Sequence, residues 1–426
     1  MVKFNENNEV MRDDEYRAIL VGLQLNEDIS YSMEELAGLA EASGIEVAGE
    51  LIQSLPKPNP ALLIGKGKVE ELGQLCENME VDTVIFNDEL SGMQLRNLED
   101  GLGVRVIDRT ILILDIFAAR ATSREGKLQV ELAQLQYRMP RLTGFGKSLS
   151  RLGGGIGTRG PGEKKLETDR RHITKRMDDI KKEIAQVKNT RDTQRIKRNK
   201  SNVPVVALMG YTNSGKSALM NQMLTLTQKE DKAVMEKDML FATLDTQHRR
   251  IKLEQDQEFI LIDTVGFVSK LPHSLIQAFK ATLEEVADAD LLLHIVDSAY
   301  EHFDFHVHVT NKVIQEIGAK DKDKIMVYNK MDIAKAIPLD TTEYESICIS
   351  AKTGYKVDVL LEKIKDKIFA DRVHAHLLVP YDRGDISSYL HAETRVLTME
   401  YEENGTLFDV ELSVEDYSRL KEYDTL

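Results

Sequence analysis

The middle of the chain carries a motif with the spacing G-x-x-x-x-G-K-S, which is typical of loops that hold the phosphates of a nucleoside triphosphate. Its glycines let successive backbone N–H groups face phosphate oxygens at the start of a helix. Lys216 is placed to neutralise the β- and γ-phosphates, and the Ser217 hydroxyl is placed to ligate Mg²⁺. An ordinary glycine turn is the alternative, although an apolar strand precedes the motif and a helical pattern follows it. The motif consists of Gly210, Tyr211, Thr212, Asn213, Ser214, Gly215, Lys216 and Ser217.

Two further segments predict the remaining phosphate and metal contacts. The first comes at the end of the next apolar strand and consists of Asp263, Thr264, Val265 and Gly266. Asp263 is placed to hold Mg²⁺ through a water, and the Gly266 N–H to touch the γ-phosphate. The second lies between these two motifs and consists of Phe241, Ala242, Thr243, Leu244 and Asp245. Thr243 can ligate Mg²⁺ while the triphosphate is bound and release it after hydrolysis, so Lys216, Thr243 and Gly266 are the candidate catalytic residues.

Two motifs near the end of this region predict that the base is guanine. Asp332 can accept hydrogen bonds from N1–H and the N2 amine of guanine, whereas adenine would leave its carboxylate unpaired. The backbone of Ala351 supplies the remaining base contact. These motifs are Asn329, Lys330, Met331 and Asp332, followed by Ser350, Ala351 and Lys352. Five elements in this order predict a GTPase that converts GTP to GDP and phosphate.

Two positions bear on the rate of hydrolysis. Phe267 follows Gly266 where Ras-like enzymes place a glutamine that orients the attacking water. A phenylalanine side chain cannot hydrogen-bond that water, so we expect slow hydrolysis alone and acceleration by a partner. Asn213 is a candidate to help hold K⁺, because potassium-activated GTPases carry G-x-x-N-x-G-K-S loops.

Composition narrows the class of protein. The 426 residues are 42% hydrophobic and 30% charged, which is typical of a globular chain of two or three domains. No run of eighteen apolar residues exists, so we expect no membrane span. The polar N-terminus is unlike a secretory signal. Cys76 and Cys348 are the two cysteines, which excludes a disulfide framework and predicts a cytoplasmic protein.

Charge is distributed unevenly along the chain. The formal net charge is −15, yet residues 138–200 contain 19 Lys and Arg against 7 Asp and Glu, a local balance of +12. A basic segment inside an acidic protein indicates a polyanionic partner, and a solvated charged helix is the alternative.

The succession of apolar runs and helical patterns predicts an α/β protein. We expect a P-loop GTPase domain with a parallel-rich sheet, preceded by an α/β N-terminal subdomain and a helical hairpin, and followed by a small α+β C-terminal domain. The predicted domains cover residues 1–121, 122–202, 203–370 and 371–426. The last domain is predicted as strand, helix, two strands joined at residues 403–405 and a final helix, and it carries no chemical signature.

The predicted hairpin rests on two sets of apolar residues at helical spacing. Leu128, Leu132 and Leu135 form the first, and a heptad seam forms the second. The seam consists of Ile173, Met177, Ile180, Ile184 and Val187. The joining segment, residues 144–162, holds eight glycines in 19 residues and several basic side chains. A flexible linker is one interpretation, and a tip whose backbone approaches phosphates closely is the other.

The chain resembles the HflX family, a class of ribosome-associated GTPases related to translation factors, over roughly residues 16 to 370. The resemblance extends beyond the nucleotide motifs. It rests on the segments 63–71, 94–99, 107–110, 125–135, 149–163, 165–167 and 169–171.

This resemblance implies a cytoplasmic, monomeric GTPase that binds the large ribosomal subunit and its rRNA, with hydrolysis stimulated there and coupled to ribosome splitting, rescue or recycling. A hibernation-type RNA-binding module with incidental hydrolysis is the alternative. GTPases of metal transport or RNA modification are disfavoured, because membrane spans and a cysteine-based or redox-cofactor site are absent from the sequence. The candidate RNA contacts are Arg151, Arg159, Lys164, Arg170 and Arg171.

Three local features qualify the resemblance. The family usually has Gly-Glu-Thr-Lys where this chain has residues 162–165, and the extra charge of Lys164 keeps RNA contact plausible. The family often has Leu-Asp-Pro-Thr where this chain has residues 244–247, and the missing proline frees the switch backbone. Some members bind ATP through the N-terminal domain, but Gly65-Lys66-Gly67-Lys68 is more typical of an ordinary turn.

Overall fold

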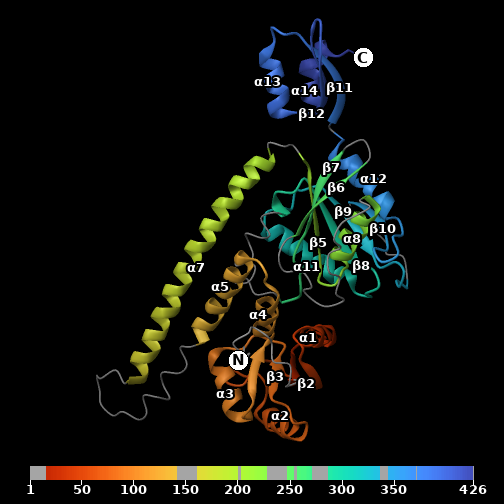
Figure 1. Cartoon of the computed structure of the whole chain (residues 1–426). Helices are drawn as coiled ribbons and strands as arrows, with labels where there is room; N and C mark the ends of the chain where they lie inside the picture. The colour runs from red at the N-terminus through yellow and green to blue at the C-terminus, as the bar shows by residue number, and fades with distance from the viewer. Residues whose placement is uncertain are drawn as a thin grey trace. The chain divides into compact units, whose positions relative to one another are not determined.

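The computed structural model of the chain is drawn in Figure 1. The chain divides into two compact units. The structure describes residues 16–141, 161–199, 203–227, 247–253, 257–270, 286–335, 344–370 and 372–425. The first unit comprises Met1–Ala185, Lys237–Asp245 and Val268–Lys280. The second comprises Gln186–Glu236, Thr246–Phe267 and Ala281–Leu426.

A fully parallel four-stranded sheet, ordered β2-β1-β3-β4, forms the centre of the first unit. Ile19 and Val21 on one face of β1 share a core with α2 and α3, while Ala18 and Leu20 on the other face are also buried. The strands are β1 (Arg17–Gln24), β2 (Glu46–Ser54), β3 (Thr83–Phe86) and β4 (Arg105–Asp108). The helices are α1 (Ser30–Ala42), α2 (Lys66–Asn78), α3 (Gly92–Leu102) and α4 (Arg109–Arg120).

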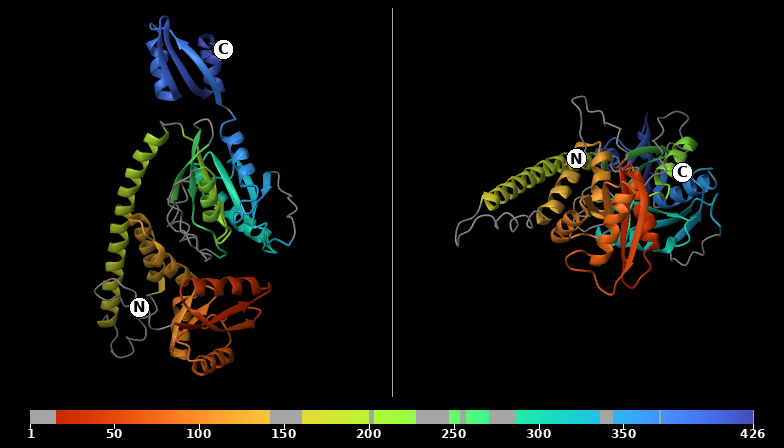
Figure 2. Two further views of the ribbon diagram at one scale, coloured as in Figure 1. Left: turned by 45° about the vertical axis from the view of Figure 1, so that its right-hand side comes forward. Right: turned by 90° about the horizontal axis from the view of Figure 1, so that it is seen from below.

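The predicted helical hairpin is present as α5 (Arg124–Arg141) and α7 (Pro161–Asn199), which lie side by side (Figure 2). Leu128 and Leu132 of α5 share a buried cluster with Met177 and Ile180 of α7. Two ion pairs show the relative direction of the helices. Arg124 pairs with Glu183 at 3.0 Å, and Glu131 pairs with Arg176 at 2.7 Å. Because later residues of α5 meet earlier residues of α7, the pair is antiparallel.

The structure changes two details of the predicted hairpin. Val187, the last predicted seam position, is half-buried and stands outside the cluster, which reaches Ile184. Pro161 and Gly162, predicted as loop, begin α7 instead, because proline's fixed φ suits the first turn of a helix. Residues 142–160, which hold most of the glycine-rich segment, lie outside the described residues.

A six-stranded sheet ordered β10-β9-β8-β5-β7-β6 dominates the second unit. All its pairs are parallel except β6 with β7, and buried residues such as Val206, Leu293 and Val327 form the core. The strands are β5 (Val205–Gly210), β6 (Gln247–Lys252), β7 (Glu258–Asp263), β8 (Leu291–Asp297), β9 (Lys324–Asn329) and β10 (Glu345–Cys348). The helices include α8 (Lys216–Thr227), α11 (Phe303–Glu316) and α12 (Val357–Ile368). The predicted parallel-rich α/β fold is confirmed.

The C-terminal part follows the predicted order of elements. Its antiparallel sheet is ordered β11-β13-β12. The elements are β11 (Arg372–Val379), α13 (Gly384–Glu393), β12 (Arg395–Glu402), β13 (Gly405–Ser413) and α14 (Val414–Leu420). Gly405 is required at the hairpin, because a Cβ there would stand 2.3 Å from the Val379 carbonyl oxygen. Among the described residues, no helix combines the length and apolar character needed to cross a membrane.

A buried histidine in the central sheet predicts acid sensitivity. His294 in β8 is 1% exposed, and burial, assisted by Lys324 and Lys216, lowers its pKa from 6.5 to about 3. The native state therefore binds fewer protons than the unfolded chain between these values. We expect the unfolding free energy to fall by about 1.4 kcal/mol per pH unit as the pH drops below the ordinary histidine value. Urea unfolding at pH 7.5 and 5.5 measures this loss. The unfolding free energy of His294→Leu should fall less between the two pH values than that of the unaltered protein, and an equal fall in both proteins would contradict the role assigned to His294.

Candidate functional site

The phosphate-binding loop joins β5 to α8 in a conformation that depends on glycine. Gly210 has φ +154° and Gly215 has φ +91°. A Cβ at Gly210 would stand 2.2 Å from the Ile295 carbonyl oxygen, and a Cβ at Gly215 would stand 2.3 Å from Asn329 Nδ2. The backbone conformation and the close neighbouring atoms therefore both exclude a residue larger than glycine at these two positions. The loop ends at the N-terminus of α8, where Lys216 and Ser217 are the first residues of the helix.

Lys216 folds back over this loop. Its side chain donates to the carbonyl oxygens of Gly210 at 3.2 Å and Tyr211 at 2.7 Å. Burial lowers the pKa of Lys216 to about 8; Asp263 opposes this shift and Lys330 adds to it. The ammonium group therefore stays charged at neutral pH. A buried ammonium group that donates only to backbone carbonyl oxygens can exchange these acceptors for phosphate oxygens, so Lys216 is suited to neutralise a bound phosphate.

Two oxygen-bearing side chains meet beside the loop. The Ser217 hydroxyl donates to Asp263 Oδ2 at 2.6 Å. Register brings them together, because Leu208 near the end of β5 pairs with Asp263 at the end of β7. A hydroxyl and a carboxylate are the hard oxygen donors that Mg²⁺ prefers, so these residues fit that ion. Thr243, the third predicted metal ligand, lies outside the described residues, as do Phe241, Ala242, Leu244 and Asp245.

The segment after Asp263 is fastened to the phosphate-binding loop. Thr212 N–H donates to the Phe267 carbonyl oxygen at 2.6 Å, and Phe267 N–H donates to the Gly210 carbonyl oxygen at 3.2 Å. A Cβ at Gly266 would stand 2.7 Å from Thr212 Cα, so the two backbones touch. The Phe267 side chain is buried, which agrees with its predicted inability to orient a water. Thr264 donates its hydroxyl to the Leu208 carbonyl oxygen at 2.6 Å.

Asn329 connects the predicted base-binding motifs to the phosphate-binding loop. Its side-chain nitrogen donates to the Ser214 carbonyl oxygen at 2.9 Å, and its side-chain oxygen accepts from Ala351 N–H at 2.8 Å. The Ser350 hydroxyl donates to Asp332 Oδ1 at 2.7 Å. Three segments far apart in sequence thus meet at one end of the sheet. Lys330 forms an ion pair with Asp297 at 2.8 Å.

Comparison with known families agrees with this arrangement. Residues 30–118 match a family described as GTP-binding GTPase N-terminal, residues 120–198 match GTP-binding GTPase Middle Region, and residues 205–330 match 50S ribosome-binding GTPase. GTPase HflX of Caldanaerobacter subterraneus is 48% identical over 97% of this chain and 95% of its own length. The chain belongs to the HflX family of GTPases.

Other members of the HflX family match over similar lengths. GTPase HflX of Lacrimispora saccharolytica is 42% identical over 96% of both chains. GTPase HflX of Escherichia coli is 37% identical over 95% of both chains. A solved GTP-binding protein from Sulfolobus solfataricus in complex with GDP has a TM-score of 0.44 and 23% identity, covering 83% of this chain and 99% of that one. This HflX-family chain is a GTPase, as the sequence predicted.

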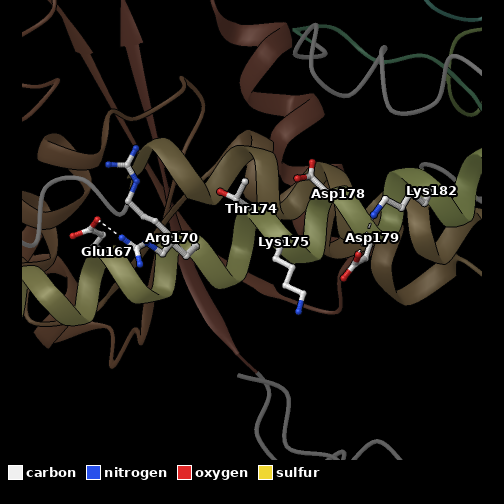
Figure 3. Close-up of a pocket in the computed structure, with 8 residues that line it drawn as sticks. Glu167, Arg170, Thr174, Lys175, Asp178, Asp179 and Lys182 are labelled. Atoms are coloured by element: carbon white, nitrogen blue, oxygen red, sulfur yellow. Dashed lines mark hydrogen bonds and ion pairs between the residues drawn. The ribbon is translucent and has the colours of Figure 1, made fainter.

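The predicted RNA contacts are only partly described. Arg151 and Arg159 lie outside the described residues, and Lys164 lies in α7 without a described side chain. Arg170 and Arg171 are exposed on α7, and Figure 3 shows Arg170 on this helix. They border a shallow hollow that also presents acidic groups. Its residues are Glu167, Arg170, Arg171, Thr174, Lys175, Asp178, Asp179 and Lys182. Arg171 pairs with Glu167 at 2.8 Å, so this stretch of α7 is mixed in charge.

The segment considered for ATP binding, residues 65–68, lies at the start of α2. Gly65 caps α2 in an extended conformation, and Lys66, Gly67 and Lys68 form the first turn of the helix. Gly65 N–H donates to Gln53 Oε1 at 2.8 Å, and Lys68 pairs with Glu71 at 2.9 Å. These contacts suit a capped helix start, which is the interpretation that the sequence favoured.

Sequence reasoning missed a buried polar cluster in the first unit, which includes the segment that follows Phe267. Arg109, 2% exposed, donates to Glu35, to Asn87 Oδ1 at 3.1 Å and to Ser269 Oγ at 3.1 Å. The Ser269 hydroxyl in turn donates to Glu35. Lys270 also pairs with Asp88 at 3.0 Å. This HflX-family protein therefore anchors the chain two residues beyond Phe267 on a charged pair from α1 and α4. The pairing spans up to 234 positions, so no local pattern reveals it.

Proposed function

We propose that this GTPase binds the large ribosomal subunit and couples its nucleotide state to ribosome splitting, rescue or recycling. The observation that carries the proposal is the meeting of the predicted phosphate- and base-binding motifs at one end of the sheet, in the same chain as residues 138–200, which have a local charge of +12 and include α7. The match of residues 205–330 to a family described as 50S ribosome-binding GTPase supports the same partner. We further propose that the protein acts in the cytoplasm as a monomer, with the domain boundaries predicted from the sequence.

Each part of the nucleotide site has a defined task in this proposal. Bound Mg²⁺, held by Ser217 and Asp263 and joined by Thr243, would supply positive charge beside the γ-phosphate. Lys216 leaves the loop carbonyls to neutralise the β- and γ-phosphates, and Gly266 N–H contacts the γ-phosphate. Asp332 accepts from guanine, with its orientation fixed by Ser350. Phe267 gives no hydrogen bond to water, so the ribosome accelerates hydrolysis.

The basic arm supplies the RNA contacts. Arg151, Arg159, Lys164, Arg170 and Arg171 are proposed to contact rRNA phosphates, which would make binding steeply dependent on salt. Reversing charge with Arg170→Glu should weaken pelleting with large subunits. The matched control, Lys320→Glu, changes an exposed lysine in the GTPase domain and should pellet as the unaltered protein does.

A splitting assay separates the proposed switch from an RNA-binding module in which hydrolysis is incidental. Intact ribosomes are incubated with the protein and GTP, with the protein and a non-hydrolysable analogue, or with Lys216→Ala and GTP, and subunits are quantified by gradient sedimentation. We expect subunit release in the first two arms, with turnover confined to GTP, and little release by the variant. Identical behaviour in all three arms would remove the switch and leave the binding module.

Potassium activation is a prediction from Asn213. This residue holds φ +57° in the phosphate-binding loop, a left-handed conformation that asparagine tolerates better than most residues. There its side chain is proposed to help hold K⁺ against the phosphates. We expect GTP hydrolysis in 200 mM KCl, a concentration of about physiological order, to exceed that in NaCl, and the difference to shrink in Asn213→Ala. Equal rates in the two salts would remove the K⁺ site.

A further inference from the structure

The C-terminal sheet has one core face and one open face. Leu377 of β11 and Phe408 and Val410 of β13 point into the core formed with α13 and α14. Because side chains alternate along a strand, the residues between them point to the opposite face. His374, His376 and Asp409 lie there, and their side chains are 54%, 39% and 22% exposed.

These three side chains converge. His376 and Asp409 are direct partners in the antiparallel register, and His374 stands two residues earlier on the same strand. One nitrogen of each imidazole and one carboxylate oxygen all lie within 4.8 Å of one another. His374 Nε2 contacts Asp409 Oδ1, and His376 Nδ1 stands 3.9 Å from the same oxygen. The imidazole ring centroids are 5.2 Å apart with an interplanar angle of 62°.

The backbone beneath this cluster is held on both sides. β11 pairs with β13 from Arg372 to Val379. On the other edge of β11, Thr425 donates both its N–H and its hydroxyl to the His376 carbonyl oxygen, each at 2.9 Å. The backbone positions of the three residues are therefore held by these bonds, and rotation of the side chains would bring the donor atoms closer. Ligand atoms around a tetrahedral ion stand roughly 3.3 Å apart, given bonds of about 2 Å.

We propose that His374, His376 and Asp409 bind a divalent transition-metal ion of the zinc class. Two imidazole nitrogens and one carboxylate oxygen suit Zn²⁺, Co²⁺ or Ni²⁺, whereas Mg²⁺ prefers oxygen ligands alone. Three protein ligands leave at least one coordination position for water. Within the part of the chain that the structure describes, this is the one cluster of at least three histidine, cysteine or carboxylate side chains with this geometry.

Metal binding at this position would have a mechanical consequence. The ion would tie the edge strand β11 to the central strand β13 on the face opposite α13 and α14. Because the site requires the folded register, metal would stabilise the C-terminal domain in proportion to the logarithm of its free concentration. The competing interpretation is an exposed His374–Asp409 ion pair, which would add little stability and need no metal.

Titration calorimetry with Zn²⁺ tests the proposal on the full chain, with GDP and excess Mg²⁺ present to occupy the nucleotide site. We expect saturable binding of one Zn²⁺ per chain. His374→Ala, His376→Ala and Asp409→Asn should each weaken that binding by at least about tenfold. The matched control, His391→Ala, removes an exposed histidine on α13 and should bind as the unaltered protein does.

A second readout separates loss of ligand from loss of fold. Circular dichroism and GTP hydrolysis should be unchanged in all four variants, and Zn²⁺ should raise the unfolding temperature of the unaltered protein and of His391→Ala only. Visible absorption of the Co²⁺ form should show the intense bands of a low-coordinate site and lose them in Asp409→Asn. Absence of saturable Zn²⁺ binding, or binding by folded His376→Ala equal to that of the unaltered protein, would overturn the proposal.

Discussion

Replacing Asp332 with asparagine is expected to lower GTP affinity about 100-fold or more and to raise affinity for xanthosine triphosphate. Hydrogen bonds to a charged acceptor contribute about 1.5–3 kcal/mol each, and guanine offers Asp332 two of them. In the variant, the NH2 group of the asparagine amide would face the N2 amine of guanine. Both groups are hydrogen-bond donors, so no hydrogen bond forms between them. Xanthine carries an oxygen at that position and would accept from the amide instead.

Equilibrium binding of both nucleotides to both proteins measures this exchange. The hydroxyl of Ser350 can still donate to the asparagine oxygen, so the loop should keep its shape. Asp304→Asn, an exposed change at the start of α11, provides the control and should leave both affinities unchanged. An Asp332→Asn protein that still prefers GTP over xanthosine triphosphate would show that Asp332 does not read the base.

The second large effect is expected from Glu35→Gln. Arg109 and Glu35 are both nearly inaccessible to solvent, with side chains 2% and 3% exposed. Removing one charge of a buried pair leaves the other uncompensated, which typically costs about 3–5 kcal/mol. We expect the unfolding free energy of the first unit to fall by about that amount. Amide exchange of residues 268–270 should accelerate, because glutamine offers one acceptor oxygen, whereas the N–H and hydroxyl of Ser269 use both oxygens of the Glu35 carboxylate.

Chemical denaturation and amide exchange together test this anchor. Glu50→Gln on β2 is the matched control, since Glu50 is exposed in the same unit and should change neither measurement. Replacing both partners by apolar residues, as in Glu35→Leu with Arg109→Met, should recover much of the lost stability without restoring protection at Ser269. Equal stability of Glu35→Gln and the unaltered protein would contradict the assigned role of the pair.

The nucleotide motifs were visible in the sequence because each is local. A glycine turn, a helix start and a polar residue at the end of an apolar strand are encoded within a few positions, and parallel strands then bring their carboxyl ends together. The central sheet followed from apolar runs, and the seam of α7 followed from its heptad spacing, which are also local patterns. The edge strand β6 contains no apolar run, so this kind of pattern does not predict it.

The remaining features depend on pairing between distant residues. Arg109 carries no local sign that Glu35 and Ser269 will surround it. His374 and His376 form an unremarkable pair in the sequence until the register of β11 and β13 sets Asp409 opposite. Lys216 was expected at phosphates, but its contacts with two loop carbonyls depend on side-chain packing that spacing does not encode.

Sedimentation of the full chain with purified large ribosomal subunits tests the central claim most directly. Parallel samples contain GDP, GTP or a non-hydrolysable GTP analogue, at low and moderate salt. The account predicts one protein per subunit in the pellet with the analogue, much less with GDP, and a steep loss of binding as salt rises. Equal pelleting in every nucleotide state, or none in any, would contradict a ribosome factor switched by GTP.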